Sequence, residues 1–166
     1  MDVASRRLGA QGLTDPDSPD ALAVTDRLLA IQAQDPRGAR LAVRARLGDS
    51  IQSPSSALVD AALNKGQLVV GWLNRGTLHL VRSEDYLWLH SVMAPRQATA
   101  NRTRLRQEGV SEKQAERGVR LIEERLSEGP ATRSELRDLL EDDGVPVAGQ
   151  AMVHILYLAS IRGLIV

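Results

Sequence analysis

The sequence predicts a mainly α-helical protein with short β-hairpins, organised as two tandem winged-helix (helix-turn-helix) modules, the second lacking its wing. Two observations carry this prediction. Apolar residues recur at helical spacing in several segments that begin with capping signals. After the first three such segments, residues 67–81 form two β-rich runs around an Asn-Arg-Gly turn. Three helices followed by a two-stranded hairpin is the order of a winged helix.

The composition is that of an ordinary globular chain. The 166 residues are 43% hydrophobic and 25% charged, with a net charge of zero and no cysteine. This length allows one or two domains with real cores, and the lack of cysteine excludes disulfides and thiolate metal sites. No apolar run approaches the ~18 residues of a membrane span, and the N-terminus lacks a signal-peptide pattern. We therefore expect a cytoplasmic protein that does not bind membranes.

The first module is expected to span residues 1–95. Residues 1–20 form a short head broken by glycine and proline. Ser18-Pro19-Asp20 is typical of a helix start, and Pro36 disfavours helical geometry at Asp35. Capping and periodicity predict the following elements: helices over about 20–33, 38–46, 54–65 (capped by Ser53-Pro54-Ser55-Ser56) and 85–92, and strands over 67–72 and 77–81.

Residues 96–110 are polar and arginine-rich, and we expect them to connect the two modules. The second module, residues 111–166, begins with a helix over 111–127. A Thr132-x-x-Glu135 capping box opens the next helix, and a third is expected over 148–161. Residues 164–166 are expected to begin a strand. Because that strand has no hairpin partner, the chain is expected to be the N-terminal half of a longer protein.

Basic charge is carried by 19 arginines against two lysines and gathers in two acid-free stretches, residues 37–47 and 96–106. Arginine suits bidentate phosphate contacts, although a high-GC genome gives the same bias without any function. Arg37, Arg40 and Arg44 are spaced three and four apart, so they form one stripe on a helix. The stripe is interpreted either as a phosphate-facing ridge or as a solvated face.

The sequence lacks the motifs of several enzyme classes. It has no Gly-x-Ser-x-Gly elbow and no phosphate-binding loop. Its three histidines are too dispersed for a metal signature. His90 carries no motif, and His154 lies in an apolar segment, which favours packing over ligation. We expect neither a metal nor a cofactor.

Gln32 and Gln34 stand where an apolar helical pattern runs into Asp35-Pro36. The helix is expected to end just before Pro36, which places both glutamines in its last turn or in the loop beyond. At such an end both amides can face one site. An arbitrary Gln-x-Gln is more often a polar C-terminal turn on a core helix, so the surrounding residues decide its interpretation.

Residues 28–37, Leu-Leu-Ala-Ile-Gln-Ala-Gln-Asp-Pro-Arg, resemble the signature of the winged-helix DNA glycosylases of the AlkZ/YcaQ type, which repair alkylpurines and interstrand crosslinks. Residues 75–81 resemble the Arg-Gly-Thr-x-His segment of the same family. Pro95-Arg96 and residues 163–165 extend the similarity over nearly the whole chain. The resemblance implies that Gln32 and Gln34 position a water molecule as the catalytic pair. Some relatives have an acid at the second position, and family members carry further winged-helix material after position 166.

The resemblance also implies a damaged double-stranded DNA partner and a monomeric protein. Thr77 and His79 are two apart on a strand and share a face; they brace the glutamine loop, contact the substrate or pack across the strands. Trp72 is interpreted as a core residue or a stacking surface. The residues expected to contact DNA are Arg37, Arg40, Arg44, Arg75, Thr77, His79 and Arg96.

The expected function is repair by hydrolysis of the N-glycosidic bond of an alkylated or crosslinked purine nucleotide, as a monofunctional glycosylase in the longer protein. Alkylation at N3 or N7 makes the base a good leaving group. Two neutral amides then suffice to orient a water molecule and to stabilise developing positive charge. One alternative is a non-catalytic regulator with residues 57–64 or 151–161 in the major groove. Another is a protein-interaction module.

Overall fold

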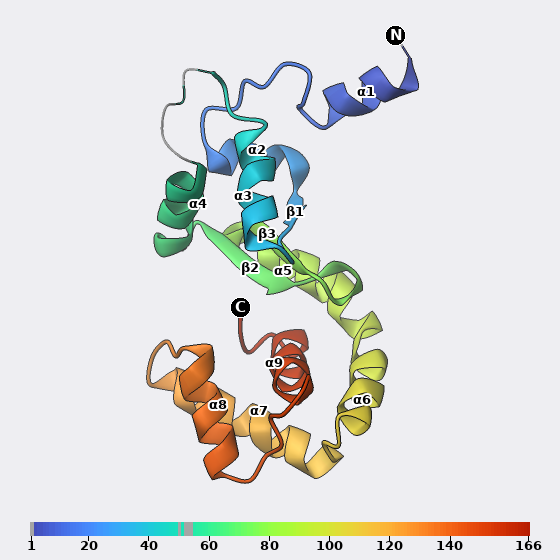
Figure 1. Ribbon diagram of the computed structural model, residues 1–166, viewed down its shortest axis with the longest axis vertical. Helices are drawn as coiled ribbons and strands as arrows, with labels where there is room; N and C mark the ends of the chain where they lie inside the picture. The colour runs from blue at the N-terminus through green and yellow to red at the C-terminus, as the bar shows by residue number, and fades with distance from the viewer. Residues whose placement is uncertain (1, 50, 52–54) are drawn as a thin grey trace. The chain divides into compact units, whose positions relative to one another are not determined.

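The computed structural model describes residues 2–49, 51 and 55–166, as a mainly helical chain with a three-stranded antiparallel sheet (Figure 1). The chain divides into two compact units, Met1–Leu89 and His90–Val166. The division falls inside helix α5 (Ser83–Met93). The expected connector at 96–110 is therefore not a linker: it lies within the second unit, mostly as helix α6 (Ala98–Gln107). Buried Asn101 and Leu105 explain this, because they give an otherwise polar segment an inward side.

The first unit interleaves helices with strands, and the sheet order is β1-β3-β2. The hairpin predicted over residues 67–81 is confirmed as β2 and β3. In chain order the elements are α1 (Val3–Ala10), α2 (Ala21–Leu28), β1 (Ala30–Gln32), α3 (Pro36–Arg44), α4 (Ser55–Asn64), β2 (Leu68–Trp72), the short turn η1 (Asn74–Gly76), β3 (Leu78–Arg82) and the beginning of α5.

The helix predicted over about 20–33 begins near the expected residue but ends five residues early. The N-cap is Asp20, whose carboxylate accepts from the Ala23 N–H at 2.8 Å. At the other end α2 stops at Leu28, and Leu29 adopts a left-handed φ of 65°. The chain then continues as β1, which pairs with β3. Local periodicity missed this strand because its hydrogen-bond partner is distant in sequence.

Two other helix boundaries differ from expectation. Helix α3 begins at Pro36 and not at residue 38, because Asp35 caps it by accepting from the Arg37 N–H at 2.9 Å and proline suits the first turn. The predicted Ser53–Ser56 cap of α4 lies largely outside the described residues. The end of α4 is confirmed: Gly66 has a φ of +67°, which few other residues adopt without strain.

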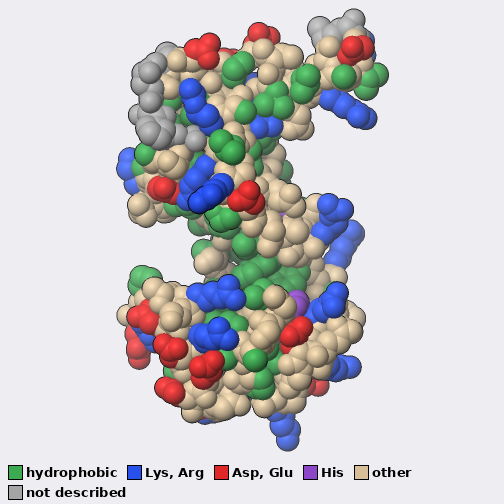
Figure 2. All heavy atoms as spheres, in the orientation of Figure 1, with side chains coloured by type: hydrophobic (Ala, Val, Ile, Leu, Met, Phe, Trp, Pro, Cys, Tyr) green, Lys and Arg blue, Asp and Glu red, His purple; other side chains and the backbone are tan. Residues whose placement is uncertain are grey.

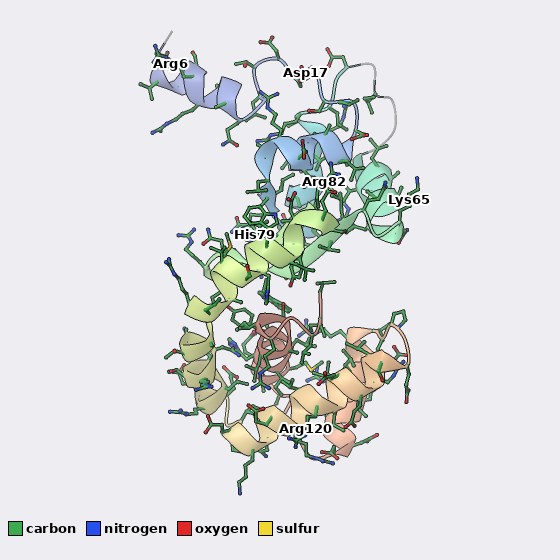
Figure 3. The ribbon with its side chains drawn as sticks, turned by 180° about the vertical axis from the view of Figure 1, so that it is seen from behind. Arg6, Asp17, Lys65, His79, Arg82 and Arg120 are labelled. Atoms are coloured by element: carbon green, nitrogen blue, oxygen red, sulfur yellow. The ribbon has the colours of Figure 1, made fainter. Side chains whose placement is uncertain are left out.

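The core of the first unit lies between one face of the sheet and helices α2, α3 and α4. Ile31, Leu80 and Val70 stand side by side across the three strands on that face. Fully or nearly fully buried aliphatic residues from all three helices pack there, including Val24, Val43 and Val59. The opposite face meets α5, which crosses the sheet in both ribbon views (Figures 1 and 3).

The second unit is built from helices. It contains the end of α5, the short turn η2 (Ala94–Arg96), α6, α7 (Glu112–Ser127), α8 (Arg133–Asp142) and α9 (Ala151–Ile161). Capping boxes at Ser111/Gln114 and Thr132/Glu135 begin α7 and α8, which confirms both predicted starts. The strand expected at 164–166 does not form, since no strand lies within the second unit to pair with it. None of the described helices is long and apolar enough to span a bilayer.

Helices α6 and α9 are joined by reciprocal hydrogen bonds between Asn101 and His154. Asn101 Nδ2 donates to the His154 carbonyl oxygen at 3.0 Å, and His154 Nδ1 lies 2.9 Å from Asn101 Oδ1. Asn101 is fully buried. Burial, opposed by Glu108 and reinforced by Arg104, lowers the pKa of His154 below the usual 6.5.

We expect acid to destabilise the second unit through His154. As the pH falls, the unfolded chain takes up a proton near its ordinary pKa while the folded imidazole stays neutral. The free energy of unfolding therefore decreases as the pH falls below about 6.5. Urea denaturation at about pH 7.5 and about pH 5.5 measures this loss, which should be larger for the wild type than for His154→Gln. Equal losses would contradict the assignment.

Candidate active site

Strand β1 places the Gln-x-Gln motif on one face of the sheet. Side chains alternate along a strand: Ile31 and Ala33 are 5% and 4% exposed and face the core, whereas Gln32 and Gln34 are exposed. The two amides therefore share a side because of strand alternation. The helix end expected there from the sequence is absent, because the chain is in strand β1.

Gln34 closes the end of the β1–β3 ladder with its side chain. Its Oε1 accepts from the Leu78 N–H at 3.2 Å, while the Ala33 N–H donates to the Leu78 carbonyl at 2.8 Å. One amide of the pair is thus held in a fixed position by the backbone of β3, and its Nε2 remains available as a donor.

Removing the hydrogen bond between the Gln34 side chain and the Leu78 N–H, called the Gln34 clamp below, should loosen the edge of the sheet. Gln34→Ala deletes the acceptor of the Leu78 N–H, so we expect the Leu78 amide to exchange with solvent about fivefold faster, the equivalent of about 1 kcal/mol of lost protection. Gln34→Glu retains an oxygen acceptor and should preserve the protection. Hydrogen exchange followed by NMR provides the measurement. Unchanged exchange in Gln34→Ala would show that the clamp contributes nothing.

Gln32 lies directly opposite His79 in the ladder. The flanking pair Ala33 and Leu78 is hydrogen-bonded, so Gln32 and His79 form a non-hydrogen-bonded pair, in which opposed Cβ atoms are about 4.5–5.5 Å apart. Within residues 2–49, 51 and 55–166, no group hydrogen-bonds the Gln32 carboxamide. Its oxygen and nitrogen therefore remain free to bind water or substrate.

His79 is nearly enclosed but keeps one side open. It is 9% exposed, and its Nδ1 lies 2.9 Å from the Thr77 carbonyl oxygen. Its neighbour on β2 is Gly71, where an added Cβ would come within 2.4 Å of the Tyr86 ring. The ring of α5 therefore occupies the space above Gly71; Figure 3 labels His79 beside this helix. A lone glycine inside a predicted strand was the available signal for this close approach.

The predicted DNA-contacting residues separate into three groups. Arg37, Arg44 and Arg75 are exposed in the first unit. Arg40 instead forms an ion pair with Asp60 of α4 and donates to the Pro36 carbonyl at 2.9 Å, so the three-residue stripe on α3 is interrupted in the middle. Arg96 lies in η2 of the second unit.

One further residue expected to contact DNA has a local partner. Thr77 Oγ1 donates to the Asn74 carbonyl at 3.0 Å, which ties it to the hairpin turn. Trp72 is half-buried on β2. In the space-filling view, acidic side chains lie among the basic ones on both units, and no uniformly basic surface is visible on that face (Figure 2).

The described residues contain no group of three or more His, Asp or Glu side chains arranged to hold a metal ion.

The model of the AlkZ-like DNA glycosylases matches residues 25–166, which include the whole site. The chain therefore belongs to the AlkZ-like DNA glycosylase family.

The chain is similar to the solved structure of Streptomyces sahachiroi DNA glycosylase AlkZ, with a TM-score of 0.73 and 27% sequence identity. The alignment covers 95% of this chain and 43% of that one, so the chain spans less than half the length of this relative. No curated protein matches the chain.

Proposed function

We propose that this chain carries the water-positioning site of a DNA repair glycosylase that hydrolyses the N-glycosidic bond of alkylated or crosslinked purine nucleotides. The observation that carries the proposal is Gln32: an exposed carboxamide without a hydrogen-bond partner in the described chain, held on a paired strand beside the clamped Gln34. A polar group presented in this way from a rigid element is preorganised for binding a reactant.

The substrate explains why neutral amides suffice. An alkylated purine is positively charged and leaves readily, so the enzyme needs to expose the nucleotide, hold a water molecule at the sugar C1′ and stabilise developing positive charge. The Gln32 oxygen accepts a hydrogen bond from that water, and the amide dipoles stabilise the charge. Gln34, held through Leu78, keeps the strand edge in place and adds its own dipole. A glutamine is too weak a base for normal DNA, which favours labile lesions.

The element order supports a winged-helix interpretation of the first unit. Helix α2, strand β1, helices α3 and α4, and the β2–β3 hairpin follow one another as in that class, with β1 completing the sheet. The second unit, with α7, α8 and α9, supports a second module without a wing. In this interpretation Arg37, Arg44 and Arg75 contact phosphates of duplex DNA from the first module, and Arg96 contacts them from the second. The protein is proposed to act as a cytoplasmic monomer.

The alternative function is that of a non-catalytic DNA-binding regulator, with residues 57–64 or 151–161 as its recognition helix. The second of these candidates, helix α9, is not suited to that role. Eight of the eleven residues of α9 are buried, including the consecutive run Ile155–Ser160. A helix enclosed on most sides cannot enter a major groove. Classical base recognition by residues 151–161 is therefore not supported.

The test is base release from duplex DNA that carries a single N7-alkylguanine, measured with the complete natural gene product and with this 166-residue chain. Release by the gene product establishes the activity, and release by the chain as well places the whole site within it. Salt-dependent DNA binding without release by either would overturn the proposal in favour of a non-catalytic DNA-binding module.

A further inference from the structure

The row of side chains across the sheet at Gln32 is closed at one end and open at the other. It runs from Gln32 on β1 through His79 on β3 to Gly71 on β2. The Tyr86 ring lies above Gly71 and closes the β2 end. At the β1 end the neighbour is Gln32, which is exposed. His79 is therefore approached from the side of the glutamine.

The Thr77 carbonyl determines the tautomer of His79. A carbonyl oxygen only accepts hydrogen bonds, so His79 Nδ1, 2.9 Å away, must carry the hydrogen. In the neutral ring Nε2 then bears the lone pair. Within the described chain this Nε2 is not hydrogen-bonded to protein, and it is not completely enclosed either. The small exposure that His79 retains thus reaches a ring nitrogen that can accept a proton.

We propose that His79 is a second catalytic residue, whose Nε2 accepts the proton of the water molecule that Gln32 holds. This assignment rests on the proposed function. The C1′–N9 bond breaks and its electron pair goes to the base, which leaves as neutral N7-alkylguanine. The water oxygen bonds to C1′, its proton passes to Nε2, and the imidazolium returns the proton to solvent. The net products are the free base, an abasic sugar and one proton.

Of the titratable side chains near the row, His79 is the one that lies within it. The titratable side chain packed above the row is Tyr86 of α5. On β3, Arg82 points to the opposite face, where it pairs with Asp26 of α2 and Glu84 of α5. Asp85 of α5 accepts from the Trp88 indole at 2.8 Å. Beyond Gln34 and Thr77, the charged residues at that end of the ladder are Asp35, which caps α3, and Arg75 in the turn.

The test is the pH dependence of the single-turnover rate of base release from DNA with one N7-alkylguanine, using the complete gene product. The wild-type rate should decrease on acidification, because protonation of Nε2 removes the acceptor of the water proton. His79→Gln should be slower by at least about tenfold near neutral pH and should lose this acidic limb. His90→Gln, a histidine of the second unit that contacts the Ser160 carbonyl, is the matched control and should retain the wild-type profile.

A measurement on the unmodified protein keeps the assignment testable if His79→Gln does not fold. Long-range ¹H–¹⁵N NMR spectra of the imidazole should report a protonated Nδ1 and an unprotonated Nε2 near neutral pH. The reverse tautomer would overturn the assignment. So would a His79→Gln rate and profile equal to the wild type, with base release intact. Absence of release by the wild type would instead overturn the proposed function and the assignment together.

Discussion

Replacing Gln32 with alanine should lower the rate of base release from N7-alkylguanine DNA by about a hundredfold or more, with DNA affinity unchanged. The carboxamide has no hydrogen-bond partner in the described chain, so its removal breaks no hydrogen bond of the folded protein. The loss therefore falls on the transition state, where the amide orients water and opposes developing charge. The measurements are single-turnover release and equilibrium binding to the same duplex, with the complete gene product.

Gln67 supplies the control for this experiment. It is another exposed glutamine of the first unit, located just before β2, and it is hydrogen-bonded through its backbone: its carbonyl accepts from the Ser83 N–H at 3.1 Å, and its N–H donates to the Ala62 carbonyl at 2.9 Å. Gln67→Ala should retain the full rate. Equal melting temperatures for the two variants would exclude unfolding as the cause. A Gln32→Ala protein with wild-type release would remove the glutamine from the mechanism.

Gly71→Ala should be the most destabilising single-methyl change in the sheet. An added Cβ would lie 2.4 Å from Tyr86 Cε2 and 2.9 Å from the Tyr86 hydroxyl, and the ring, 4% exposed, has little room to move. Overpacking of this kind lowers the free energy of unfolding by about 1–3 kcal/mol, and a clash with a rigid ring should lie at the upper end of this range. The shift of the urea midpoint measures the cost.

Two comparisons make the Gly71 result specific. Gly48→Ala adds a methyl group whose nearest neighbour is 3.7 Å away, so it should change stability little. In a Tyr86→Ala background the ring is absent, and the penalty of Gly71→Ala should largely disappear. A penalty that persists in that background would mean that backbone conformation, and not the ring, requires glycine at position 71.

Several elements were predictable because their signals are local. The β2–β3 hairpin follows from two β-rich runs around Asn74-Arg75-Gly76. The starts of α7 and α8 follow from side chains that cap backbone groups three residues away, at Ser111 and Thr132. The identity of the candidate pair, Gln32 and Gln34, came from residues that stand next to each other in the chain. Each of these features depends on interactions within a few residues.

The arrangement of the site depends on contacts between distant segments. Leu29 leaves the helical pattern because β1 gains hydrogen bonds to β3, and no pattern within residues 20–33 contains that partner. The same pairing brings His79 opposite Gln32 and lets Gln34 hold Leu78. Likewise, Arg40 is drawn away from its stripe by Asp60, and α6 becomes a packed helix through Asn101 and His154. The chain thus carries the candidate catalytic residues in its local sequence, whereas long-range pairing and burial determine which groups face each other there.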